Sequence, residues 1–210
     1  MQQPLLDTLL IGISATFIAI IFTLFTLEAE QLRGLPLSRF ASLVIYLPML
    51  IPSIAFLFGL VWLQEQVNSH HAFFNVIFSH LLFVVPYVFL SLASSYRRMD
   101  PRFANLAASL GAPPAKVFWQ VKLPMLFAPI CIALALGLAI SFSQYLPTLL
   151  NGGGRINTIT TEAVALASGA SRRVSSVYAL MQMLLPALAF ALAWVIPTLL
   201  KKYQHRPKHT

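Results

Sequence analysis

The sequence predicts an all-α membrane protein with about five transmembrane helices, and three observations support this fold class. Of the 210 residues 58% are hydrophobic and only 10% are charged, against about 25% in a typical soluble domain. The mean hydropathy is +0.78, and a chain of this length cannot hide so much apolar surface in a core surrounded by water. The apolar residues also form runs of about 20, the length with which a helix crosses a bilayer. The same composition excludes a disordered chain, which needs many charges and few apolar residues.

Five apolar runs are long enough to span a membrane, and they cover residues 5–27, 41–63, 73–95, 126–147 and 177–200. The first and the last are the clearest, because residues 8–27 and 177–200 contain no charged side chain. The third is the weakest, because His80 lies within it. No intervening stretch is long enough for a soluble domain. We therefore expect residues 1–200 to form a single transmembrane domain.

The positions of lysine and arginine predict the orientation, because these residues are retained on the cytoplasmic side of the membrane. Eleven of the fourteen fall in three stretches that lie on one side if every run crosses the bilayer: residues 28–40, 96–125 and 201–210. The other three lie on the opposite side: Arg155, Arg172 and Arg173. The predicted orientation is therefore N-out and C-in. Residues 201–210 then form a basic cytoplasmic tail that touches anionic lipid.

The cytoplasmic loop at residues 100–124 is patterned as two short amphipathic helices. Asp100-Pro101 suits an N-cap followed by the first helical position, and Gly111 suits a left-handed C-cap. Between them one apolar stripe recurs at helical spacing: Phe103, Leu106, Ala107 and Leu110. Pro113-Pro114 then opens a second helix, with its own stripe of Val117, Phe118 and Val121. Such a pair predicts a docking surface for another protein. The alternative is a helix pair that lies among the lipid headgroups.

The same loop carries a spaced pattern that runs from Asn105 to Gly111 and, after nine residues, continues as Val121-Lys122-Leu123-Pro124. This pattern resembles the cytoplasmic signature of binding-protein-dependent ABC importer permeases, which reads Glu-Ala-Ala, three residues, Gly, nine residues and Ile-x-Leu-Pro. Asn105 replaces the glutamate and Leu106 an alanine, while Val121 stands in for the isoleucine. By this resemblance the ATPase-coupling residues are Asn105, Leu106, Ala107, Ala108, Gly111, Val121, Leu123 and Pro124.

The resemblance extends over essentially the whole chain. Five spans, N-out and C-in, with cytoplasmic coupling helices between the third and the fourth, are the core of the type I ABC importer fold, also called MetI-like. The stretches at residues 141–147 and 160–166 are similar to permeases of the thiamine, iron and polyamine branch. In that branch two such units are often fused in one polypeptide. The resemblance therefore implies either one half of such a permease or a truncated one.

A permease of this family is a multi-pass protein of the bacterial inner membrane and does no covalent chemistry. The resemblance implies that this chain forms half of a pathway for a thiamine-, polyamine- or iron-type solute and binds no cofactor. A separate cytoplasmic ABC ATPase dimer hydrolyses ATP, since the chain has no P-loop pattern. The other implied partners are a second permease half, a periplasmic or lipid-anchored solute-binding protein, and membrane lipids. We expect no nucleic acid, because the basic residues lie between apolar runs and not on a soluble face.

Polar side chains within a bilayer are costly and usually face the bundle interior or a water-filled path. On this ground the candidate substrate-path residues are His80, Ser143, Gln144, Tyr145 and Gln182. The alternative is that such side chains form hydrogen bonds between helices. No metal site is expected, because Cys131 is the single cysteine.

Three other functions are compatible with parts of the sequence. An ATPase-independent channel or secondary carrier needs charged residues within the spans, and Asp7 at the edge of the first run is the nearest carboxylate. A degenerate, truncated permease half is a second possibility, because Asn105 departs from the signature. An intramembrane serine protease would pair Ser141 or Ser143 with His80, although the exposed-nucleophile pattern G-x-S-x-G is missing.

Overall fold

The computed structural model describes residues 2–67, 71–167 and 172–204, and these ranges contain helices and loops but no β-strand. Three helices are long and apolar enough to cross a membrane: α1 (Gln2–Arg33), α4 (Ala72–Arg97) and α11 (Arg172–Gln204). Two bent helix pairs raise this number to five if each pair is one span. The predicted all-α membrane fold is confirmed.

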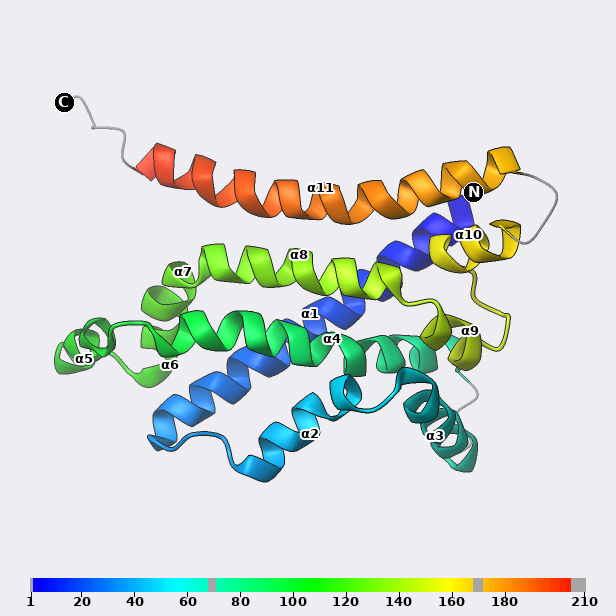
Figure 1. The fold of residues 1–210 in the computed structure, drawn as a ribbon. Helices are drawn as coiled ribbons and strands as arrows, with labels where there is room; N and C mark the ends of the chain where they lie inside the picture. Colours follow the sequence, from blue (N-terminus) through cyan, green and yellow to red (C-terminus); the bar gives the residue numbers. More distant parts are fainter. Residues whose placement is uncertain (1, 68–70, 168–171, 205–210) are drawn as a thin grey trace.

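The core lies where α1 crosses α4 and α8 (Phe127–Ser143), and α11 packs along the outer side of α8 (Figure 1). Its fully buried members are mostly aliphatic, and they include Ala19, Val84, Val88, Leu92 and Ala133. α1 and α8 approach closely because small residues face each other. A Cβ atom at Gly137 would lie 2.5 Å from Cγ2 of Thr16. Close packing of small residues is a main source of helix association in membranes.

The run at residues 41–63 does not form one straight helix. It is divided into α2 (Arg39–Leu50) and α3 (Ser53–Gln66), which meet at an angle of 110°. The break follows from Pro52, because a proline disfavours helical geometry in the residue before it. Ile51 accordingly has an extended backbone, with φ −88° and ψ 141°.

The run at residues 126–147 is also interrupted. α8 ends at Ser143, and Gln144 has an extended backbone that redirects the chain into α9 (Leu146–Gly152). At its other end α8 meets the preceding helical segment, Pro114–Met125, at 72°. α10 (Ile159–Ala167) follows α9 and packs against α11 and the start of α1.

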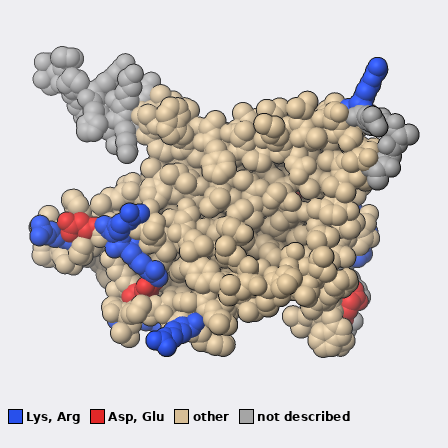
Figure 2. Space-filling view, in the orientation of Figure 1, with Lys and Arg blue, Asp and Glu red and all other residues tan. Residues whose placement is uncertain are grey.

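The two ends of the bundle differ in composition. Figure 2 shows Lys, Arg, Asp and Glu side chains gathered around α5 and the neighbouring end of α1, and a broad uncharged surface over the middle. The N-terminus and α10 lie at the opposite end from α5 and the end of α11 (Figure 1). The predicted N-out, C-in orientation requires this arrangement, but which end faces the cytoplasm stays a prediction. Residues 205–210 of the predicted tail lie outside the described residues.

Candidate functional site

The predicted coupling loop begins with a well-capped helix, α5 (Pro101–Ser109). The carboxylate of Asp100 accepts a hydrogen bond from the backbone N–H of Arg102 at 2.9 Å, and Pro101 occupies the first helical position. At the other end Gly111 has φ +79°. The N–H of Gly111 donates to the carbonyl of Ala108 and that of Ala112 to the carbonyl of Ala107, which is the Schellman arrangement. The predicted start and end of this helix are confirmed.

α5 presents its apolar stripe to the outside of the chain. Leu106 is 65% exposed and Leu110 is 82% exposed, and Phe103 is also exposed. α5 has no fully buried residue, so it adds nothing to the core of the bundle. An apolar face of this kind at the charged end of the molecule is suited to contact another protein.

The second predicted helix of the loop is not a regular α-helix. It begins as α6 (Pro114–Val117), continues as a π-helical turn, η1 (Phe118–Lys122), and ends as α7 (Leu123–Met125). In η1 the N–H of Leu123 donates to the carbonyl of Phe118, five residues back. The wider turn suits the following Pro124, which has no N–H to donate and whose ring crowds an ordinary α-helical turn.

A buried charged cluster joins η1 to two spans. The ammonium of Lys122 lies 2.7 Å from both carboxylate oxygens of Glu28 in α1, and the hydroxyl of Tyr96 in α4 donates to the same carboxylate. The side chains of Lys122 and Glu28 are only 6% and 12% exposed. We call Glu28, Tyr96 and Lys122 the anchor cluster. From the sequence alone, Lys122 has only a topological role and Glu28 has none. The one signal in the sequence for this cluster is a carboxylate, Glu28, directly after an apolar run.

A second polar cluster lies near the other end of α8, where His80 of α4 meets the break between α8 and α9. Its Nδ1 lies 2.7 Å from the hydroxyl of Ser141, and its Nε2 lies 2.9 Å from the hydroxyl of Thr148. The Thr148 hydroxyl also donates to the carbonyl of Gln144. It therefore accepts from Nε2–H, and a neutral ring with Nδ1 as the acceptor for Ser141 satisfies the network. We call His80, Ser141 and Thr148 the histidine cluster.

The structure brings together only some of the predicted substrate-path residues. The amide of Gln144 reaches the carbonyl of His80 at 3.4 Å, while its Oε1 is buried and has no partner. Ser143 donates within its own helix, to the carbonyl of Ile140. Tyr145 lies at the break beside Gln144, and Gln182 lies on α11, half-buried. No hydrogen bond among the described residues joins Gln182 to His80 or Gln144.

The geometry of the histidine cluster does not suit a serine protease. Ser141 and His80 are each 2% exposed, so a peptide cannot reach the hydroxyl. The second ring nitrogen of His80 faces the hydroxyl of Thr148, where a triad has a carboxylate that orients the ring. Within residues 2–67, 71–167 and 172–204 no group of three or more His, Cys, Asp and Glu side chains is suited to a metal ion.

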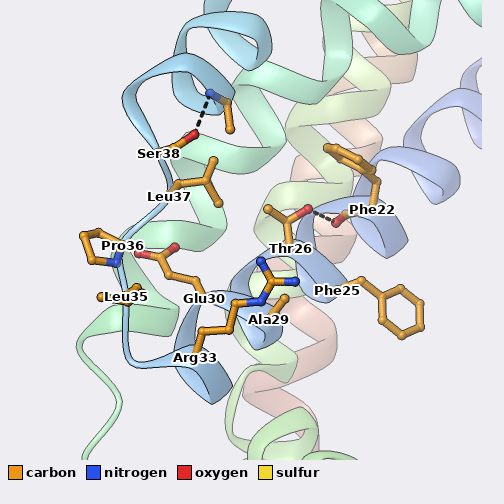
Figure 3. A pocket seen from close by; sticks show the side chains of 11 residues that line it. Phe22, Phe25, Thr26, Ala29, Glu30, Arg33, Leu35, Pro36, Leu37 and Ser38 are labelled. Carbon is orange, nitrogen blue, oxygen red and sulfur yellow. Dashed lines mark hydrogen bonds between the residues drawn. The ribbon is translucent and has the colours of Figure 1, made fainter.

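A cleft of about 540 Å³ lies at the same end as α5, between the end of α1 and the loop that leads into α2. Figure 3 shows Glu30 and Arg33 reaching into it from α1, and the hydroxyl of Ser38 capping the N–H of Ala41 on its far side. Solute sites of transporters lie near the middle of the bilayer. This position at one end of the bundle therefore does not suit the predicted substrate path.

The comparison with protein families decides what kind of chain this is. Residues 15–166 match the family described as binding-protein-dependent transport system inner membrane component. The chain belongs to this family. Its members in the bacterial inner membrane are components of transport systems, and the match includes the whole coupling loop and both polar clusters.

Several curated relatives of this permease family are similar over most of the chain. The inner membrane ABC transporter permease protein YnjC of Escherichia coli K12 is 37% identical over 195 residues, which are 93% of this chain and 37% of the relative. A PotC homolog of Mycoplasma genitalium, named as a spermidine/putrescine transport system permease protein, is 28% identical over 79% of this chain and 60% of its own length. The 2-aminoethylphosphonate transport system permease protein PhnV of Salmonella typhimurium LT2, a putative assignment in its name, is 28% identical over 70% and 57%. This permease chain thus spans between about a third and three fifths of the length of these relatives.

Proposed function

We propose that the chain acts as a permease subunit of an ATP-driven importer. It forms half of a solute pathway and receives the movement of a cytoplasmic ABC ATPase through α5, α6, η1 and α7. The observation that carries the proposal is α5 itself: a helix fixed at both ends by caps, outside the core, with exposed Leu106 and Leu110 at the position of the family signature. A rigid amphipathic helix can be gripped in a groove and can transmit a rigid-body movement.

The proposed partners follow from this role. An ATPase dimer binds α5 on the cytoplasmic side, a second permease unit completes the pathway, and a solute-binding protein delivers the solute at the end with α9 and α10. The chain is oriented N-out and C-in, and its basic tail contacts anionic lipid. The matched family is named for its dependence on a binding protein, which supports the last partner.

The proposed solute is a small molecule of the polyamine, thiamine or iron type, with the polyamine type preferred. Two kinds of observation support this preference. Relatives are named as spermidine/putrescine permeases, and the buried Oε1 of Gln144 is an acceptor without a partner that suits an amine donor. We propose that the path passes the break between α8 and α9, with Gln144 and Tyr145 on its wall and Ser143 and Gln182 beside it. His80 is buried behind this wall and supports it through its hydrogen bonds with Ser141 and Thr148.

The test is purification of the chain in mild detergent from its native host, followed by identification of the proteins that co-purify. We expect an ABC ATPase, and its loss in the Leu106→Asp and Leu110→Asp variants. These side chains are exposed, so the substitutions leave the bundle intact. The matched control is Leu35→Asp, which changes an exposed leucine at the same end of the bundle but outside residues 100–124 and should keep the ATPase bound.

Gly111→Val offers a second route to the same result. A valine strains the backbone at φ +79° and unwinds the C-cap, and we expect membrane insertion without ATPase binding. Gly34→Val is its control, because Gly34 has φ +63° in a different loop. A folded chain that never binds an ATPase would contradict the proposal and favour a degenerate half, and solute uptake without any ATPase would favour a channel or carrier.

A further inference from the structure

The anchor cluster is placed where the coupling segment, Pro114–Met125, returns to the membrane helices. Lys122 is the last residue of η1, and Glu28 lies 94 positions earlier in α1. Among the hydrogen bonds and ion pairs of the described residues, those of Lys122 are the ones that join this segment to another span. The segment also reaches the bundle through apolar packing, in which Phe118 and Leu123 contact the core and Val117 is buried, and through the chain itself.

The charge of the cluster has a geometric consequence. Apolar side chains of similar volume would hold η1 against α1 without the cost of removing charges from water. They would, however, allow η1 to slide along α1. The ammonium of Lys122 contacts both oxygens of Glu28 at once, and the Tyr96 hydroxyl takes a further position on one of them. Such a contact is satisfied in one register only, so it fixes where η1 sits along α1.

The connection matters because the covalent route from α5 into the bundle is bent. The segment Pro114–Met125 meets α8 at 72°. When α5 moves, a bend of this size can change its angle, so that the movement does not reach α8. α1 packs against both α4 and α8, so a force applied to α1 reaches the whole core.

We propose that Glu28 and Lys122 are positioning residues for energy coupling: their ion pair holds η1 on the cytoplasmic end of α1, so that a movement of α5 displaces α1 and α8 together. Tyr96 orients the carboxylate of Glu28. The inference rests on the proposed function for the source of the movement, but the attachment of η1 to α1 can be measured without it.

The first measurement follows the outer end of α1 in the purified complex with its ATPase, after Cys131→Ser. Spin labels at Gln3 and Glu65, two exposed positions, report the distance between the start of α1 and the end of α3. We expect ATP binding to change this distance in the otherwise unmodified complex. In Glu28→Gln and Lys122→Met the ATPase stays bound and hydrolyses ATP, but the ATP-dependent distance change is lost.

The matched control is Arg97→Met. It removes the ion pair between Arg97 and Glu30, which lies at the same end of α1 but does not involve the segment Pro114–Met125. The Arg97 side chain is half exposed, whereas that of Lys122 is buried. The Arg97→Met complex should show the same ATP-dependent distance change as the unmodified complex. The double exchange Glu28→Lys with Lys122→Glu should recover part of the response, which loss of folding alone does not predict. An equal response to ATP in Lys122→Met would overturn the proposal.

The second measurement places the labels at Leu32 and Ala115, which line the two sides of a groove between α1 and α6. We expect one narrow distance distribution in the unmodified chain and a broad one in Lys122→Met, with or without the ATPase. A narrow distribution in the variant would show that the ion pair does not hold η1. If the unmodified chain binds no ATPase, the proposed function fails, and this measurement still decides whether the attachment exists.

Discussion

The two ends of α8 are attached to the bundle by different chemistry. Near its start the anchor cluster uses a full ion pair between Lys122 and Glu28. Near its end the histidine cluster uses neutral hydrogen bonds, in which His80 accepts from Ser141 and donates to Thr148. A buried pair is costly to form and costly to break, while a hydrogen bond between membrane helices contributes little. The difference indicates a fixed attachment at the end with the anchor cluster and one that is easier to rearrange at the end with the histidine cluster.

The largest effect is expected from Lys122→Ala. It leaves the carboxylate of Glu28 buried without its counter-ion, and removal of one partner of such a pair costs about 3–5 kcal/mol. We expect a clear fall in the midpoint of thermal unfolding in detergent. The double variant Glu28→Leu with Lys122→Met should regain most of this stability while leaving the coupling defect, and a double variant no more stable than Lys122→Ala would contradict the ion-pair account.

A smaller effect is expected from His80→Leu. The substitution removes two hydrogen bonds but leaves two hydroxyl groups that can donate to carbonyls of their own helices, so the loss should be about 1–2 kcal/mol, given that bonds of this kind contribute about 0.6 kcal/mol on average. The same unfolding assay measures it. A loss as large as that of Lys122→Ala would remove the difference between the two ends.

The smallest effect is expected from Thr148→Val. The hydrogen bond that His80 donates to Thr148 and the one from Thr148 to the carbonyl of Gln144 are lost, while the shape of the side chain is kept, so the change should be about 1 kcal/mol. Thr26→Val is the matched control, because the hydroxyl of Thr26 is exposed and donates only to the carbonyl of Phe22 in its own helix. Thr148→Val should lower the midpoint of thermal unfolding more than Thr26→Val does.

The parts of the fold that depend on local sequence were predictable. The apolar runs at residues 5–27, 73–95 and 177–200 correspond to α1, α4 and α11. Each run is longer than the bilayer requires, and none of them is divided into two helices. The ends of α5 followed from Asp100 and Gly111, since both caps are decided by neighbouring backbone atoms.

The parts that depend on distant residues were not predictable in the same way. The bend at Ile51-Pro52 and the π-helical turn before Pro124 both lie at prolines, but a proline does not say by how much a helix changes direction. The partner of Lys122 is 94 positions away and that of His80 is 68 positions away at Thr148. No periodicity in a single sequence connects such residues. For His80 the alternative of hydrogen bonds between helices is what the structure shows.

The corner between α2 and α3 limits what can lie beside it. α1 ends and α4 begins at opposite ends of the bundle (Figure 1), so α2 and α3 together carry the chain from one side to the other in spite of the 110° angle. A helix that stops leaves its last carbonyl groups without partners, and hydrocarbon offers none. Leu50 at this corner is 70% exposed in the isolated chain. In a membrane the corner must therefore be covered by another polypeptide or open onto water. In either case the corner is a position at which lipid does not contact the chain.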